Sequence, residues 1–166
     1  IFNDIGPVIA EQLRQGGFVA DYSTPADTGT RESDGTQKIW LNGHGGSIID
    51  PFDTLQMYHS RYWAPIGEPT SYNSRYKNPE YDALIDEMAK LQPSPDDAVY
   101  MDLYLKAVEI YLRDLIDAPI QQWLHRIPYN TTYWTDWPTA ENNYVNGAFW
   151  HETVGLIFNR LKPTQA

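Results

Sequence analysis

The chain has 166 residues, a net charge of −10 and no cysteine. Its length suits one domain with a sizeable core, or part of a larger protein. The negative charge repels a phosphate backbone, so no nucleic acid partner is expected, and the lack of cysteine excludes disulfides, thiolate nucleophiles and cysteine-ligated metals.

The first quarter of the chain predicts one helix and two strands. Residues 4–16 carry apolar side chains at helical spacing, with a proline in the first turn and glycines at the end. Residues 18–22 and 38–42 have the composition of strands, and the polar stretch 23–37 between them predicts an exposed loop. The second strand runs directly into LNGHGGSIIDP, residues 41–51.

The middle of the chain predicts three helices. A short one follows Pro51. Asn78, followed by proline and glutamate, gives an N-cap and a favourable first turn for a helix that runs to about residue 91. Ser94, followed by proline and two aspartates, starts a long helix through Leu115 in the same way.

The remaining segments are rich in proline and aromatic residues. Residues 61–77 and 128–146 predict irregular structure, 117–125 an edge strand and 147–161 a last helix. Strands that alternate with helices imply an α/β domain with a mixed sheet flanked by helices. Six tryptophans and twelve tyrosines outnumber five phenylalanines, and rings with a polar end suit surfaces that are partly apolar and partly wet.

The glycine-rich stretch lacks the motifs of phosphate sites and of nucleophilic enzymes. In a dinucleotide-binding fingerprint the third glycine would stand at Ile48, and the lysine of a P-loop is missing. An oxyanion loop like that of esterases would need a G-x-S-x-G nucleophile turn, which the sequence does not contain. The four histidines have no ligand spacing, so neither a metal nor a cofactor is expected.

Paired carboxylates keep an enzyme open as an alternative. A glycoside hydrolase needs two carboxyl groups on either side of the scissile bond. The candidate acids for that chemistry are Asp50, Asp53, Glu68 and Glu141.

Several marks, read in chain order, resemble one family. They are the sequence NGHGG at a strand end, Asp50-Pro51, YKNPEYDALI at residues 76–85, the long helix after it, and API at 118–120. This succession is similar to the C-terminal part of the large solute-binding proteins of ABC importers that take up oligopeptides, dipeptides, nickel and oligosaccharides. The resemblance covers nearly the whole chain, and YKNPEYDALI is its most specific piece.

The resemblance implies one lobe of a two-lobed, periplasmic-binding-protein-like fold, without enzymatic activity. Residues 1–127 would form the ligand-binding C-terminal lobe, and residues 128–166 an aromatic loop and helix that pack toward a missing N-terminal lobe. The partners would be that lobe, a small soluble ligand and an ABC permease. The location would be the periplasm, or the cell surface as a lipoprotein, with the signal sequence outside these residues.

The resemblance also implies where the ligand binds. In the family the glycine-rich strand end faces the cleft. Peptide-binding members carry an aspartate three positions before the Asp-Pro pair, and this aspartate binds the ammonium group of the peptide. Ser47 stands there, so a buried ammonium would lack a counter-charge.

An oligosaccharide of the cello or manno type is therefore the expected ligand, because aromatic rings and neutral polar groups suit sugars. Two alternatives stay open: an oligopeptide paired with a different counter-charge, and aromatic rings that only attach the tail to the missing lobe. The predicted binding residues are Asn42, His44, Gly46, Ser47, Trp123 and Trp134.

Overall fold

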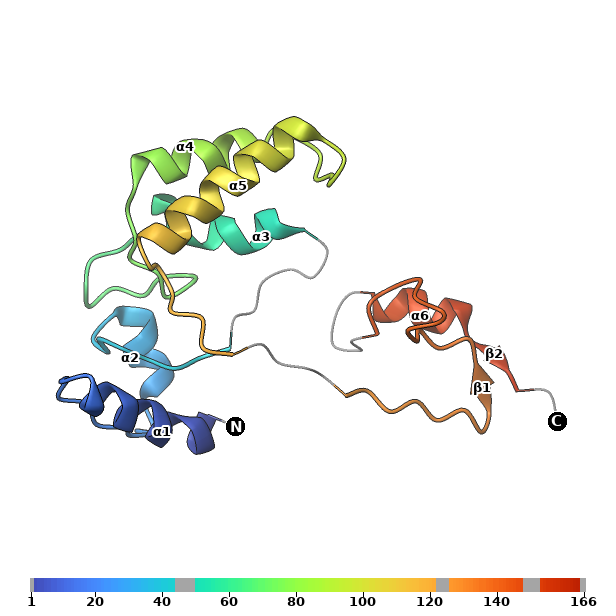
Figure 1. The fold of residues 1–166 in the computed structure, drawn as a ribbon, viewed down its shortest axis with the longest axis horizontal. Helices are drawn as coiled ribbons and strands as arrows, with labels where there is room; N and C mark the ends of the chain where they lie inside the picture. The colour runs from blue at the N-terminus through green and yellow to red at the C-terminus, as the bar shows by residue number, and fades with distance from the viewer. Residues whose placement is uncertain (1, 44–49, 122–125, 148–152, 165–166) are drawn as a thin grey trace. The chain divides into compact units, whose positions relative to one another are not determined.

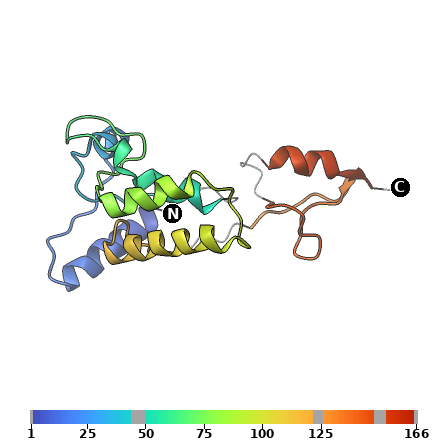
Figure 2. The same cartoon turned by 90° about the horizontal axis from the view of Figure 1, so that it is seen from above.

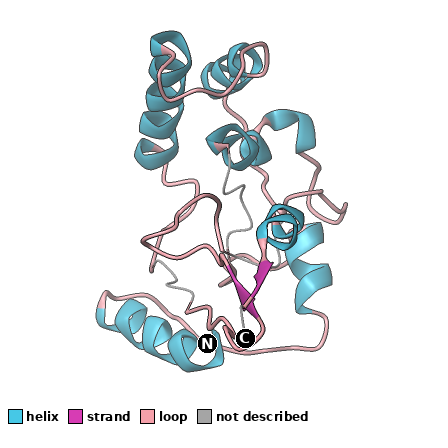
Figure 3. Cartoon of the chain, turned by 90° about the vertical axis from the view of Figure 1, so that its right-hand side faces the viewer, coloured by secondary structure: helices cyan, strands magenta, loops and turns pink. Residues whose placement is uncertain are grey.

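The computed structural model of the chain describes residues 2–43, 50–121, 126–147 and 153–164. The chain divides into two compact units, residues 1–118 and 119–166 (Figure 1). Helices make up most of the regular structure (Figure 3). The helices of the first unit are α1 (Phe2–Gln15), α2 (Thr28–Asp34), α3 (Pro51–Leu55), α4 (Pro79–Met88) and α5 (Ala98–Arg113), with short 3-10 helices η1 (Gln56–Tyr58) and η2 (Ser60–Tyr62).

Three helices begin at side chains that act as N-caps. The Asn78 carboxamide accepts hydrogen bonds from the backbone N–H groups of the first turn of α4, and Asp97 does the same for α5. Asp50 accepts from the backbone N–H of Phe52 at the start of α3. Each cap satisfies donors that the helix itself leaves unpaired. The predicted cap at Asn78 is confirmed, whereas the helix predicted to start at Ser94 begins at Ala98 with Asp97 as its N-cap.

The core of the first unit lies between α3, α4 and α5. Figures 1 and 2 show α4 and α5 side by side, and both helices contact α3. Large side chains at helical spacing fill the space between them, and a tyrosine is fully buried in each of the two longer helices. The buried cluster consists of Leu55, Tyr58, Tyr81, Ile85, Met88, Tyr100, Ala107 and Ile110.

The polar stretch predicted as a loop contains α2, so this prediction is wrong for 28–34. The helix ends at Gly35, which adopts a left-handed φ of 76° that glycine tolerates well. Two carbonyls of its last turn accept hydrogen bonds from a distant loop, with Gly67 N donating to Asp34 O at 2.8 Å and Thr70 N to Ser33 O at 3.0 Å. A tertiary contact thus stabilises a helix that its own sequence favours weakly.

The strands predicted over 18–22 and 38–42 are absent, and among the residues that the structure describes no backbone pairs with either segment in a sheet. The first segment instead returns along α1. The Tyr22 ring lies over Gly6, where an added Cβ would come within 2.1 Å of it, and the Tyr22 hydroxyl donates to the carbonyl of Phe2 at 3.1 Å. In the second segment Ile39 is 74% exposed.

The expected mixed sheet does not occur in the described residues. Residues 117–121 form no strand, and the rest of that predicted strand, 122–125, lies outside the described residues. The second unit contains instead a small antiparallel pair, β1 (Trp134–Thr135) and β2 (Lys162–Pro163), with Trp134 opposite Pro163. Helix α6 (Val154–Arg160) falls within the predicted last helix. Taken together, the described fold is helix-rich with a two-stranded sheet.

Every helix in the described ranges is too short or too polar to cross a bilayer.

The cap of α5 gives a test of this fold. Replacing Asp97 with alanine leaves two backbone donors at the helix start without their acceptor, so we expect the free energy of unfolding to fall by about 1 kcal/mol. Urea denaturation of the variant measures the change. Asp97→Asn keeps a cap acceptor and should stay close to the unmodified protein; equal losses in both variants would contradict the capping role.

Candidate functional site

Asn42 lies directly before the first glycine of the glycine-rich stretch, and its side chain contacts a buried carboxyl group. The Asn42 Nδ2 donates to Oε2 of Glu32 at 3.4 Å, and the Asn42 Oδ1 accepts from the backbone N–H of Gly43 at 2.8 Å. Asn42 itself is exposed, whereas Glu32 on α2 is only 8% exposed. The structure therefore places one predicted binding residue at the surface, in contact with a buried carboxyl group that the sequence analysis does not select.

Burial controls the charge of Glu32. Desolvation raises the pKa of its carboxyl group, and the hydrogen bond from Asn42 opposes that shift. The sequence reading missed Glu32 because it lies in a segment predicted to be an exposed loop. The signal for its burial is tertiary, since backbone hydrogen bonds from Gly67 and Thr70 hold the loop at 67–70 against the last turn of α2.

Four of the predicted binding residues lie outside the described residues. They are His44, Gly46, Ser47 and Trp123, and their roles stay predictions. Asn42 and Trp134 belong to different units, so a site that combines them also stays a prediction.

Asp50, near the end of the glycine-rich stretch, stabilises the fold. Asp50 caps α3, and its Oδ1 also accepts a hydrogen bond from the Tyr100 hydroxyl at 2.7 Å. Asp53, the nearby acid in the glycosidase hypothesis, accepts from the side-chain amide of Gln56 at 3.1 Å. Both carboxylates thus stabilise the start of the helical region.

Tyrosine–aspartate pairs recur around the same helices. Tyr58 and Tyr111 both donate to Asp117, and Tyr76 donates to Asp114. Hydrogen bonds from the Tyr76 hydroxyl and then from the Arg113 guanidinium lower the pKa of Asp114 to about 2. These contacts link the end of α5 to the segments around it and account for much of the tyrosine content by packing.

Several aromatic residues of the second unit pack on one another. Tyr129 and Trp137 stack with ring centroids 4.9 Å apart and planes inclined by 15°. The Tyr144 hydroxyl donates to the carbonyl of Asp136 at 2.8 Å, and the Arg160 guanidinium lies 4.3 Å from the centroid of the Tyr144 ring. For these three rings the structure shows a packing role within the unit.

Trp134 and Tyr133 differ from those rings because they remain exposed. The Trp134 side chain is 46% exposed and that of Tyr133 is 72% exposed. The backbone of Trp134 is fixed by pairing with Pro163 and by the Trp137 indole, which donates to the Trp134 carbonyl at 3.1 Å. An exposed ring on a held backbone offers a flat surface for stacking.

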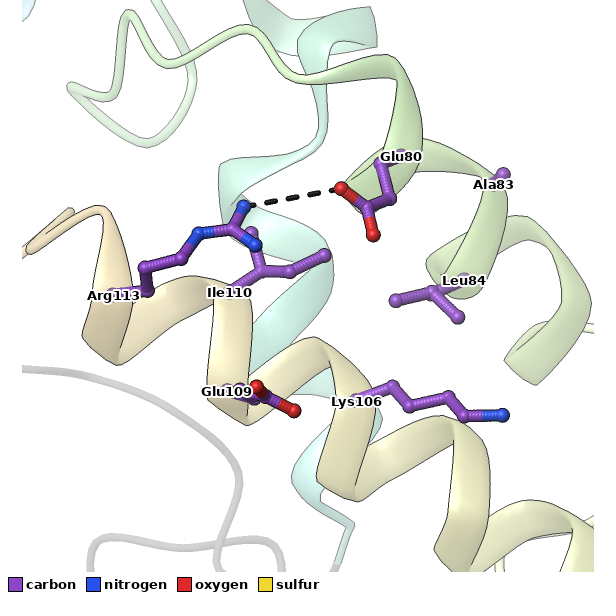
Figure 4. Close-up of a pocket in the computed structure, with 7 residues that line it drawn as sticks. All are labelled: Glu80, Ala83, Leu84, Lys106, Glu109, Ile110 and Arg113. Atoms are coloured by element: carbon purple, nitrogen blue, oxygen red, sulfur yellow. Dashed lines mark ion pairs between the residues drawn. The ribbon is translucent and has the colours of Figure 1, made fainter.

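A groove between α4 and α5 is a further concave feature of the first unit (Figure 4). Its volume is about 400 Å³. Arg113 and Glu80 face one another across it at 3.9 Å, and Lys106 is held by Asp102 on its own helix at 2.6 Å. Because Arg113 and Lys106 already pair with carboxylates of the protein, this groove does not point to a particular class of ligand. It is lined by Glu80, Ala83, Leu84, Lys106, Glu109, Ile110 and Arg113.

In the part of the chain that the structure describes, no group of histidine and acidic side chains has the arrangement of a metal site. Comparison with models of known protein families found no match, and comparison with curated proteins found no similar sequence.

The buried carboxyl group of Glu32 gives a pH-dependent prediction. Its folded pKa is raised above the ordinary 4.5, so ionisation is harder in the folded than in the unfolded state and stability falls as the pH rises through this range. Glu32→Gln removes that penalty and keeps an acceptor for Asn42. We therefore expect the variant to gain stability relative to the unmodified protein as the pH rises from about 4 to 7.

Urea unfolding at several pH values measures this difference. Glu68→Gln, which removes an exposed carboxylate, serves as the control and should show a smaller pH-dependent change. A stability difference for Glu32→Gln that does not vary with pH would contradict the assignment.

Proposed function

We propose that this chain is part of a solute-binding protein of an ABC importer and binds a neutral oligosaccharide of the cello or manno type without catalysing a reaction. The observation that carries the proposal is the exposed Trp134 ring on a backbone fixed by β2 and Trp137. The C–H faces of a sugar lie well on such a ring. Asn42, His44, Gly46, Ser47 and Trp123 complete the proposed site.

The contacts of the family-like helix start support the proposal. Asn78 caps α4, Tyr81 is fully buried with its hydroxyl on the carbonyl of Leu55, and Asp82 accepts from the backbone N–H of Ser60. Three polar residues of YKNPEYDALI therefore have specific structural tasks. Residues that cap a helix and fix its packing are the ones that proteins of the same fold are expected to share.

Exposed apolar surface supports a larger, two-lobed protein. Phe18 and Val19 are 65% and 108% exposed, and Leu105, Leu112 and Leu115 on and just after α5 are 57–63% exposed. Large apolar side chains exposed to this extent favour burial against further protein. In the proposed protein the rest of the fold covers them, two lobes close over the ligand, and the loaded protein delivers it to a permease from the periplasm or the cell surface.

The buried carboxyl group of Glu32 favours a second candidate. An oligopeptide-binding protein of the same type needs a counter-charge for the peptide ammonium, and Glu32 lies next to Asn42 at the proposed cleft. Burial raises the pKa of this carboxyl group, so holding a charge on it costs desolvation energy that a counter-charge to an ammonium would have to offset. The sugar therefore remains our preferred ligand. A glycoside hydrolase ranks below both, because Asp50 is engaged in capping and in a tyrosine contact.

The proposal predicts sugar binding that depends on Trp134. Titrated in a calorimeter, the full-length protein should bind β-linked gluco- or manno-oligosaccharides, and Trp134→Ala should weaken that binding about three- to tenfold through lost stacking. Trp63→Ala is the matched control, since Trp63 is a similarly exposed tryptophan of the first unit. Heat of binding that is unchanged in Trp134→Ala would remove this residue from the site.

The choice between sugar and peptide depends on Ser47. A carboxylate here would offset the desolvation of a peptide ammonium, a charge-assisted bond being worth about 1.5–3 kcal/mol, so Ser47→Asp should improve peptide affinity roughly ten- to a hundredfold and weaken the sugar. Calorimetry of both proteins with both ligands tests this. Tight binding of di- or tripeptides by the unmodified protein, with no heat from any oligosaccharide, would overturn the sugar proposal. Release of dye from a chromogenic glycoside would point to the hydrolase instead.

A further inference from the structure

Two asparagine–glycine pairs occur in the chain, Asn42-Gly43 and Asn146-Gly147. In such a pair the glycine nitrogen can attack the side-chain carbonyl carbon of the asparagine, because no Cβ shields that nitrogen and the glycine backbone rotates freely. Folded structure decides which pairs react, since the attacking nitrogen needs access to that carbon.

The surroundings of Asn42 favour the reaction. The Gly43 nitrogen lies 2.8 Å from Oδ1 of Asn42, which puts it beside the carbon that it would attack. Both residues are exposed, and residues 40–43 belong to no helix or strand whose backbone hydrogen bonds would hold the nitrogen elsewhere. The contact from the Asn42 Nδ2 to Glu32 keeps the amide nitrogen pointing away from the backbone.

The surroundings of Asn146 oppose the same reaction. A Cβ placed on Gly147 would lie 2.1 Å from the Tyr129 hydroxyl, so that phenol closes the space next to this glycine. The Tyr129 hydroxyl also donates to the carbonyl of Gly147 at 3.4 Å, and Thr153 donates to the carbonyl of Asn146 at 3.5 Å. These contacts restrict the backbone rotation that attack requires.

We propose that Asn42 is a site of spontaneous deamidation in the folded protein, and that this modification changes the charge of the proposed ligand site. The second half of this statement rests on the proposed function, and the first half does not.

The reaction needs only water. The Gly43 nitrogen loses its proton and forms a bond to Cγ of Asn42, and the bond from Cγ to Nδ2 breaks, so that the side-chain nitrogen leaves as ammonia with the proton. The product is a five-membered succinimide. Water then opens either of its carbonyls and yields aspartate or isoaspartate at position 42. No electrons are gained or lost.

The product would place a negative charge next to Glu32. Two carboxylates in contact repel one another, and the hydrogen bond that Asn42 now donates to Glu32 is lost. A neutral sugar would meet a charged group where an amide stands. We therefore expect lower sugar affinity in the deamidated protein.

Peptide mapping by mass spectrometry tests the modification directly. The full-length protein is incubated at mildly alkaline pH without ligand, and the peptides that contain Asn42 and Asn146 are followed for the mass gain that replaces an amide nitrogen with oxygen. We expect Asn42 to react at least several-fold faster than Asn146 in the folded protein, and the two to react at similar rates in denaturant. Gly43→Ala should slow the reaction at Asn42 and leave Asn146 unchanged.

Two results would overturn the proposal. One is an Asn42 that stays intact in the folded protein while it reacts in denaturant; the other is an Asn146 that reacts as fast as Asn42 in the folded state. Asn42→Asp imitates one product and should reduce sugar binding in calorimetry. If mapping succeeds and the unmodified protein binds no sugar, the deamidation stands and the proposed function fails.

Discussion

The hydrogen bond from the Tyr81 hydroxyl to the carbonyl of Leu55, 2.7 Å long, is the contact on which the first unit depends. Tyr81 is fully buried, so its hydroxyl needs a partner, and the carbonyl at the end of α3 supplies it. The same side chain sits in the first turn of α4, where Asn78 receives its backbone N–H. One residue thus fixes the start of α4 and its position against α3.

Other tyrosines extend this arrangement to both sides of the core. Tyr100 joins α5 to Asp50, directly after the glycine-rich stretch, and Tyr58 and Tyr111 join on Asp117 after the same helix. Each of these rings packs against the helices while its hydroxyl donates to a carboxylate, so the large side chain is buried with its polar end paired. Asp50 is thus held at the start of α3 by hydrogen bonds with both α3 and α5.

The proposed site combines such support with little charge. On the described side, Asn42 presents a neutral amide, and the Glu32 carboxyl group under it has a raised pKa because it is buried. In the second unit, Trp134 has an exposed ring on a backbone held by strand pairing. Neutral polar groups and a flat ring favour a sugar over a charged peptide end, whereas conversion of Asn42 to aspartate would reverse that balance.

The sequence by itself determined α3, α4 and α5, because the side chains that cap them stand directly before their first turns: Asp50, Asn78 and Asp97. It did not determine α2 or the absence of strands at 18–22 and 38–42. A strand needs a neighbouring backbone and α2 needs the loop at Gly67, so both depend on residues far away in the chain. The predicted site divides in the same way. The family resemblance and the aromatic run singled out Asn42 and Trp134, and only tertiary packing revealed Glu32 next to the Asn42 amide and separated the exposed rings from those that pack.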